Sequence, residues 1–117
     1  MKWSAARVLL FLTLVVPAAF IACAPQNEAL ARATAAHPEG RALFEQYNCI
    51  RCHEGGTGGY GKRMIDNPRL RDLEYVKNRI VNGKVVGAAQ MPAYPDMPRA
   101  DLEEVAKFVR ALGGWER

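Results

Sequence analysis

Histidine and cysteine are scarce in this chain of 117 residues, which has two histidines and three cysteines. A structural zinc site needs four ligands at a recognisable spacing, and so small a set does not provide them. Neither sign of charge dominates, because the chain has 16 basic and 12 acidic residues. This balance gives no argument for nucleic-acid binding. The sequence shows no strand pattern either, so it offers no βαβ context for a thioredoxin-like cysteine pair.

The first 23 residues have the composition of a leader. Lys2 and Arg7 form a basic start, and the apolar run from Val8 to Ala22 follows. This run fits the hydrophobic region of a secretory signal and is short for a comfortable membrane span. We therefore expect residues 1–23 to be a signal peptide or membrane anchor, and the protein to be exported.

Cys23 directly follows the apolar run, in Phe20-Ile21-Ala22-Cys23. A small residue before cysteine resembles a bacterial lipobox, at which the cysteine is lipidated and becomes the mature N-terminus. Cleavage after Ala24 is an alternative, because Ala22-Cys23-Ala24 is an A-x-A site. A retained anchor is the third possibility. Lipidation of Cys23 would place the protein on the periplasmic side of the bacterial inner membrane.

The length predicts one folded domain behind this leader. Residues 24–37 are rich in alanine without turn residues, which fits either a frayed helix or a flexible tether. We assign them as a tether, the natural companion of an anchor, and residues 38–117 as the domain. A domain of about 80 residues is small enough to benefit from a covalent staple.

The stretch Cys49-Ile50-Arg51-Cys52-His53 is the most informative in the chain. The pattern C-x-x-C-H is the covalent attachment signature of a c-type haem. Two thiols at this spacing reach the two vinyl groups on one porphyrin edge, and the imidazole is held under the iron as proximal ligand. A zinc site, a redox pair and a Cys49–Cys52 disulfide are the alternatives. A disulfide closing so short a loop would stabilise little.

Three helices are predicted around this motif, and the fold class is all-α. Gly40, Leu43, Phe44 and Tyr47 share one face of a short helix that begins near Pro38. Residues 72–82 form a second helix, and residues 98–112 form a third with a clear apolar stripe. The glycine-rich segment 54–61 is interpreted as backbone that passes close to a flat ligand. Residues 84–89 are expected to be a loop.

Met91 is the candidate for the sixth iron ligand, because Pro92 stiffens the loop that carries it. A thioether is a soft, neutral ligand that raises the reduction potential relative to a second histidine. Met64 and Met97 are the competing methionines, and both are better explained by packing. The other nitrogen of His53 needs a fixed partner, for which we expect the carbonyl of Pro68.

Residues 38–112 resemble a class I, monohaem, mitochondrial-type cytochrome c of the bacterial kind. The resemblance is carried by Gly40 and Phe44 before the attachment motif, by Met91-Pro92-Ala93, and by residues 101–112 with Phe108. It implies a small cytochrome c fold, with three to four helices wrapped around one covalently attached haem. The family usually has Gly-Pro-x-Leu soon after the haem loop, whereas here Asn67-Pro68-Arg69-Leu70 comes later.

These features predict an electron carrier rather than an enzyme. Iron ligated by His53 and Met91 has no open position for a substrate, so we expect one-electron transfer with redox protein partners and no small-molecule substrate. The alternative is a fixed haem subunit of a membrane redox complex, such as a quinol-oxidising complex, terminal oxidase or photosynthetic reaction centre. Peroxide or small-gas chemistry lacks a supporting second histidine or distal arginine motif. Basic residues outnumber acidic ones in residues 32–84, which could steer an acidic partner.

Overall fold

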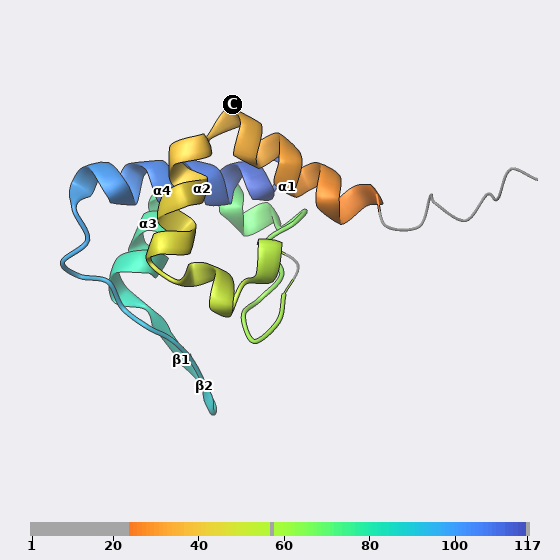
Figure 1. The fold of residues 1–117 in the computed structure, drawn as a ribbon. Helices are drawn as coiled ribbons and strands as arrows, with labels where there is room; N and C mark the ends of the chain where they lie inside the picture. Colours follow the sequence, from red (N-terminus) through yellow and green to blue (C-terminus); the bar gives the residue numbers. More distant parts are fainter. Residues whose placement is uncertain (1–23, 57, 117) are drawn as a thin grey trace, which may run out of the picture.

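Two crossing helices form the centre of the structure, a computed structural model that describes residues 24–56 and 58–116. They are α2 (Pro38–Gln46) and α4 (Arg99–Leu112), and α3 (Leu73–Asn82) and α1 (Ala24–Ala36) also pack on α4 (Figure 1). Three short 3-10 turns complete the helical part: η2 (Cys49–Arg51), η3 (Glu54–Gly56) and η4 (Pro68–Arg71). The three helices predicted from the sequence are confirmed, and the fold is mostly helical.

Gly40 allows α2 and α4 to come into contact. A side-chain carbon at this position would collide with the carbonyl oxygen of Glu104 and lie 2.7 Å from the Cβ atom of Phe108. One turn further along α2, the Phe44 ring meets the Phe108 ring edge-on, with centroids 5.3 Å apart. Edge-to-face contact is a favoured geometry for aromatic pairs. Glycine and two phenylalanines therefore fix how the two helices cross.

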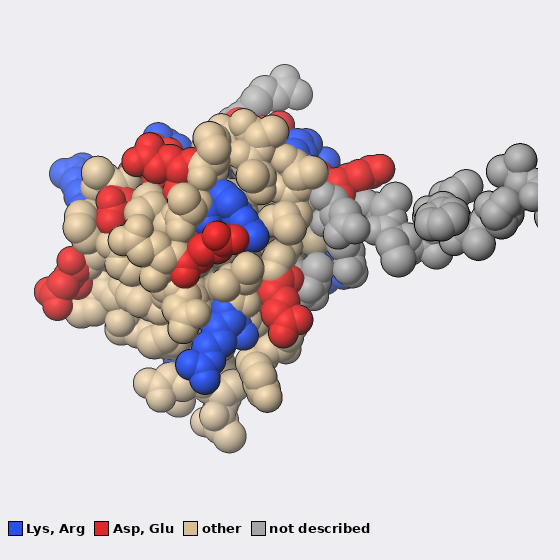
Figure 2. All heavy atoms as spheres, viewed as in Figure 1, with Lys and Arg blue, Asp and Glu red and all other residues tan. Residues whose placement is uncertain are grey.

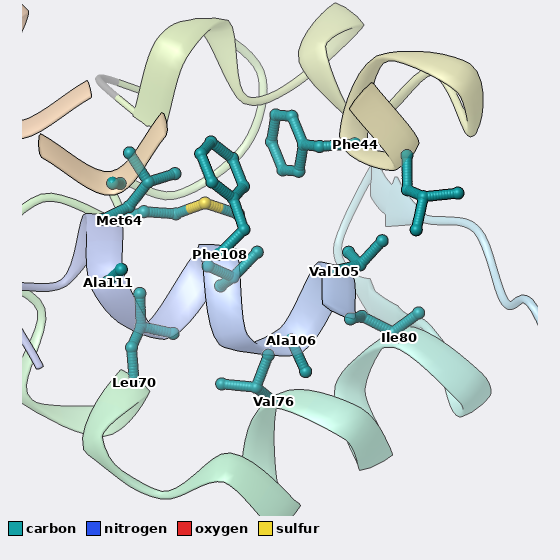
Figure 3. Packing of buried hydrophobic residues seen from close by; sticks show 13 residues of the cluster. Phe44, Met64, Leu70, Val76, Ile80, Val105, Ala106, Phe108 and Ala111 are labelled. Atoms are coloured by element: carbon teal, nitrogen blue, oxygen red, sulfur yellow. The ribbon is translucent and has the colours of Figure 1, made fainter. Parts of the chain in front are cut away.

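The hydrophobic core lies between α4 and the elements around it (Figure 3). Phe44, Phe108, Leu112 and Val105 are its largest fully buried side chains. Val76 and Ile80 of α3 close the core from the other side of α4. The apolar stripe predicted for residues 98–112 is thus the buried face of α4, as expected for an amphipathic helix.

A β-hairpin occupies the segment where a loop was predicted. Strand β1 (Lys84–Val86) pairs antiparallel with β2 (Ala89–Met91), and the register places Lys84 opposite Met91. Each strand has only three residues, too few for an alternating pattern to be recognised in the sequence. Gly83 and Gly87 have φ angles of 63° and 58°, which permit the turns at the base and the tip. The hairpin projects from the helical body (Figure 1).

The segment assigned as an alanine-rich tether is instead a regular helix that packs on the domain. Within α1, Ala29 and Ala33 are 4% and 0% exposed, and the helix packs mainly on α4. Arg32 also forms an ion pair with Glu116, at 2.9 Å. Alanine is the best helix former and leaves room for a neighbouring helix to approach closely. The same composition that suggested flexibility therefore makes a tightly packed helix.

Positive and negative side chains are scattered over the face shown in Figure 2 rather than gathered into one basic patch. Several charged side chains of the described residues form ion pairs, including Arg41 with Glu45 at 2.6 Å. Within residues 24–56 and 58–116, no helix is long and apolar enough to cross a membrane. Cys23 and the rest of the predicted leader lie outside the described residues.

Candidate functional site

The attachment motif forms a compact turn at the end of α2. Asn48 adopts a left-handed conformation with φ 60°, which ends the helix and starts η2. The amides of Cys52 and His53 then both donate to the Cys49 carbonyl, at 3.2 and 3.0 Å. This turn holds both thiols and the imidazole within one loop. The spacing of the motif is therefore matched by a local structure that keeps its three reactive side chains together.

Both attachment cysteines are free thiols and half-buried, so the structure contains no Cys49–Cys52 disulfide. Burial raises the pKa of Cys49 to about 11, and the neighbouring Cys52 adds to the shift, although a backbone hydrogen bond opposes it. Cysteines of thioredoxin-like redox pairs instead have lowered pKa values. The environment of Cys49 does not favour the redox-pair interpretation.

His53 is held by the backbone of the two neighbouring residues Gly61 and Lys62. Its Nδ1 atom lies 3.2 Å from the carbonyl oxygen of Lys62. A side-chain carbon on Gly61 would collide with the imidazole ring, so the backbone lies directly against it. Burial lowers the pKa of His53, opposed by the Lys62 carbonyl, so the ring is neutral over a wider pH range. With Nδ1 engaged, Nε2 is the nitrogen available to a metal.

The carbonyl beside His53 is therefore that of Lys62, and the prediction of Pro68 is wrong. The amides of Met64 and Ile65 both donate to the carbonyl oxygen of Gly56, at 2.8 and 3.2 Å. These two hydrogen bonds close the glycine loop beside the imidazole. Asn67 and Pro68 have another function, because the Asn67 side chain caps the start of η4. No marker in the sequence pointed to Lys62, because its backbone carbonyl and not its side chain makes the contact.

Met91 ends strand β2 and is half-buried at the edge of the core. Gly83 lies against its peptide, because a side-chain carbon there would be 2.5 Å from the Met91 carbonyl oxygen. The chain after Met91 is fixed by Tyr94, whose amide donates to the Ile80 carbonyl at 3.0 Å. Tyr94 and its contacts were not identified from the sequence, since an aromatic residue after a proline carries no specific signal.

Met64 and Met97, the two competing methionines, pack in or against the hydrophobic core. Met64 is 8% exposed and belongs to the core (Figure 3), and Met97 packs partly buried against it. Met91 as iron ligand stays a prediction: burial separates it from Met64, but Met97 is partly buried against the core just as Met91 is. Among residues 24–56 and 58–116, no group of three or more histidine, cysteine, aspartate or glutamate side chains could hold a metal ion. The zinc alternative has no support in that part of the chain.

The comparison with known proteins agrees with this site. Residues 35–109 match the family described as cytochrome C oxidase, cbb3-type, subunit III, and the chain belongs to this family of cytochrome c domains. Cytochrome c oxidase subunit 2 of Alkalihalophilus pseudofirmus (strain ATCC BAA-2126 / JCM 17055 / OF4) is 33% identical over 85 residues, which cover 63% of this chain and 25% of that relative. The chain thus spans about a quarter of its relative's length. No solved structure matches it significantly.

The chain is a cytochrome c domain that carries covalently bound haem c. The residues present fit this group. Two half-buried thiols stand at the attachment spacing, and a neutral imidazole has one nitrogen fixed and the other available. Haem c supplies one-electron redox chemistry at its iron. The protein's part is to anchor the group, orient the imidazole and keep the glycine loop against it.

Proposed function

We propose that this protein is a class I monohaem cytochrome that transfers one electron at a time, with His53 and Met91 as axial ligands. The observation that carries the proposal is that both the imidazole of His53 and the loop that follows Met91 are held in place by hydrogen bonds. The Lys62 carbonyl fixes the imidazole of His53, and Tyr94 ties the loop after Met91 to the attachment turn through a 3.0 Å hydrogen bond to Tyr47. Six-coordinate iron favours electron transfer because no position is open to a substrate.

The axial ligand is tested by substituting each methionine in the purified haem protein. Met91→Ala should remove the red absorption band of methionine-ligated ferric haem and lower the reduction potential, because a soft ligand that stabilises ferrous iron is lost. Met64→Leu and Met97→Leu are the matched controls and should retain both properties. An unchanged spectrum and potential in Met91→Ala would assign the ligand to one of the other methionines.

We further propose that the domain is tethered to the periplasmic face of the inner membrane by a lipid on Cys23. The lipobox-like Phe20-Ile21-Ala22-Cys23 supports this proposal. Membrane attachment through lipid chains needs no spanning helix. Intact mass of the native protein tests it: acyl mass on an N-terminal Cys23 is expected, and a mature protein without acyl mass would contradict it.

The second candidate is a fixed haem subunit of a membrane redox complex. The names of the matched family and of the matched relative favour it, because both describe oxidase subunits. In that case the protein is still no enzyme by itself, but relays electrons within an assembly. Extraction of native membranes in mild detergent, followed by size-exclusion chromatography at the haem absorbance, separates the two. Elution in a large fraction with other redox subunits indicates the fixed subunit, and elution alone indicates the tethered carrier.

A further inference from the structure

We propose that Tyr94 is a positioning residue that latches the loop carrying Met91 onto the haem-attachment turn. The latch is the hydrogen bond from the Tyr94 hydroxyl to the backbone carbonyl of Tyr47. This inference rests on the proposed ligation by Met91. It adds a residue that is neither a proposed axial ligand nor a haem-attachment cysteine, and that acts by keeping the Met91 loop in place.

Tyr94 contacts both sides of the site at once. Its hydroxyl donates to the Tyr47 carbonyl oxygen at 3.0 Å, across 47 residues of sequence. The rings of Tyr94 and Tyr47 meet edge-on, with centroids 6.0 Å apart and planes at 83°. Its amide donates to the Ile80 carbonyl at 3.0 Å, which joins the same residue to the end of α3. Met91 lies three residues before this double attachment, so its loop is held at its C-terminal side.

The carbonyl that receives Tyr94 is also in contact with the first attachment thiol. The Cys49 sulfur lies 4.0 Å from the Tyr47 carbonyl oxygen, within range of a weak S–H donor. When the thiol adds across a vinyl group, a sulfur–carbon bond forms and the thiol hydrogen passes to the other vinyl carbon. No oxidant is needed, and Cys49 then has no proton to donate. Tyr94 remains as the side-chain donor to this carbonyl in the mature protein.

Tyr47 is itself anchored to α4. Its hydroxyl donates to Asp101 at 2.6 Å, and this bond is the main reason why the pKa of Tyr47 is raised. The pKa of Tyr94 is raised mainly by burial. Both hydroxyls therefore keep their protons at neutral pH and remain donors. The latch joins α2, α3, α4 and the Met91 loop through two tyrosines.

The experiment measures how often the proposed ligand leaves the iron. Tyr94→Phe keeps the ring and removes only the hydroxyl donor. An ordinary hydrogen bond contributes enough that its loss should raise the affinity of the ferric haem protein for added imidazole about three- to tenfold. The red absorption band of methionine ligation should weaken in parallel. Affinity is read from an optical titration with imidazole, independently of any electron-transfer activity.

Two controls accompany this variant. Tyr60→Phe removes a hydroxyl from a side chain that is 92% exposed, and it should bind imidazole as the unsubstituted protein does. Val76→Ala removes buried volume from α3 and should lower the unfolding temperature without changing imidazole affinity. Tyr94→Phe matching Tyr60→Phe in affinity would overturn the latch. An equal rise in affinity in Val76→Ala would also overturn it, because general loosening would then explain the effect.

Failure of the proposed ligation has a different signature. If the unsubstituted protein lacks the methionine band, or if Met91→Ala leaves it intact, the ligand assignment fails, and the latch that rests on it is overturned with it. Amide hydrogen exchange on the unsubstituted haem protein gives a second reading that needs no variant. The latch predicts that the Tyr94 amide exchanges more slowly than the amides of the hairpin tip at residues 86–88. Equal exchange at both places would overturn the latch even if Tyr94→Phe does not fold.

Discussion

The Nδ1 atom of His53 is within 3.2 Å of the carbonyl oxygen of Lys62, with Gly61 directly against the same ring. The segment is Gly61-Lys62-Arg63-Met64, in which Lys62 supplies the carbonyl and Met64 is buried. This is the order of the Gly-Pro-x-Leu segment expected from the resemblance, with lysine in place of proline and methionine in place of leucine. The lysine side chain is not needed for the contact, because the backbone oxygen makes it.

Gly61→Ala should disturb the imidazole. The added methyl group would collide with the His53 ring, so either the ring or the loop must move. Overpacking of this kind costs about 1–3 kcal/mol of stability. We expect a lower unfolding temperature and a smaller fraction of chains with attached haem, measured by absorbance per protein mass. Gly87→Ala is the control for haem content: its side-chain position is open space, and although its φ of 58° makes an alanine strained there, the strain lies at the hairpin tip and not against the imidazole. Equal haem content in both variants would contradict the prediction.

Gly40→Ala should weaken the crossing of α2 and α4. Its methyl group would overlap with the backbone of Glu104 and with Phe108, and backbone cannot move aside as a flexible side chain can. In denaturant unfolding of the haem protein we expect a loss of at least about 1–3 kcal/mol, the usual cost of overpacking. Ala42→Gly, at an exposed position in the same helix, should cost about 0.5–1 kcal/mol. A larger loss in Ala42→Gly than in Gly40→Ala would show that the crossing tolerates a side chain.

Lys77 and Glu103 join α3 to α4 by an ion pair at 2.5 Å, with Glu74 also bonded to Lys77 at 3.0 Å. Glu103 is the largest cause of the raised pKa of Lys77, and Lys77 of the lowered pKa of Glu103. The lysine contribution to stability is therefore present below its ordinary pKa of 10.5 and is lost as pH rises through the raised value. The glutamate contribution is present above its ordinary 4.5 and is lost as pH falls through the lowered value.

A double-mutant cycle of Lys77→Met and Glu103→Gln should thus show coupling between about pH 5 and pH 10 and none at either extreme. Added salt should reduce the coupling, because the pair lies at the surface. Urea midpoints at four or five pH values provide the measurement. Coupling that persists unchanged in strong acid would mean that the two side chains interact through packing rather than charge.

The helices and the attachment motif were predictable because their signals are local. The stripe on α4 and the cap at Asp72, which accepts from the amides of Glu74 and Tyr75, depend on residues a few positions apart. The C-x-x-C-H spacing is likewise contained in one turn. The carbonyl beside His53 was not predictable, since it depends on how an irregular loop with several glycines at positive φ folds back. Proline was the visible marker, and it led to Pro68 instead of Lys62.

The hairpin was missed, and residues 24–37 were left between a frayed helix and a tether and assigned as a tether, for a different reason. Neither element has a recognisable pattern in a short sequence window. Three-residue strands carry no usable period, and the apolar residues of β1, Val85 and Val86, are exposed, at 69% and 57%, rather than alternating. In α1 the buried residues are alanines, which a hydropathy pattern does not separate from the exposed alanines beside them. Packing against α4, rather than composition, distinguishes a helix from a tether.

Ala33→Leu tests whether residues 24–36 are part of the folded domain in solution. Ala33 is fully buried against the core, so a leucine there has no space and should cost about 1–3 kcal/mol in unfolding free energy. Ala35→Leu makes the same change at an exposed position of the same helix and should be nearly neutral. A flexible tether would make both variants neutral, because neither side chain would meet a packed neighbour. A difference between the two substitutions therefore assigns α1 to the domain.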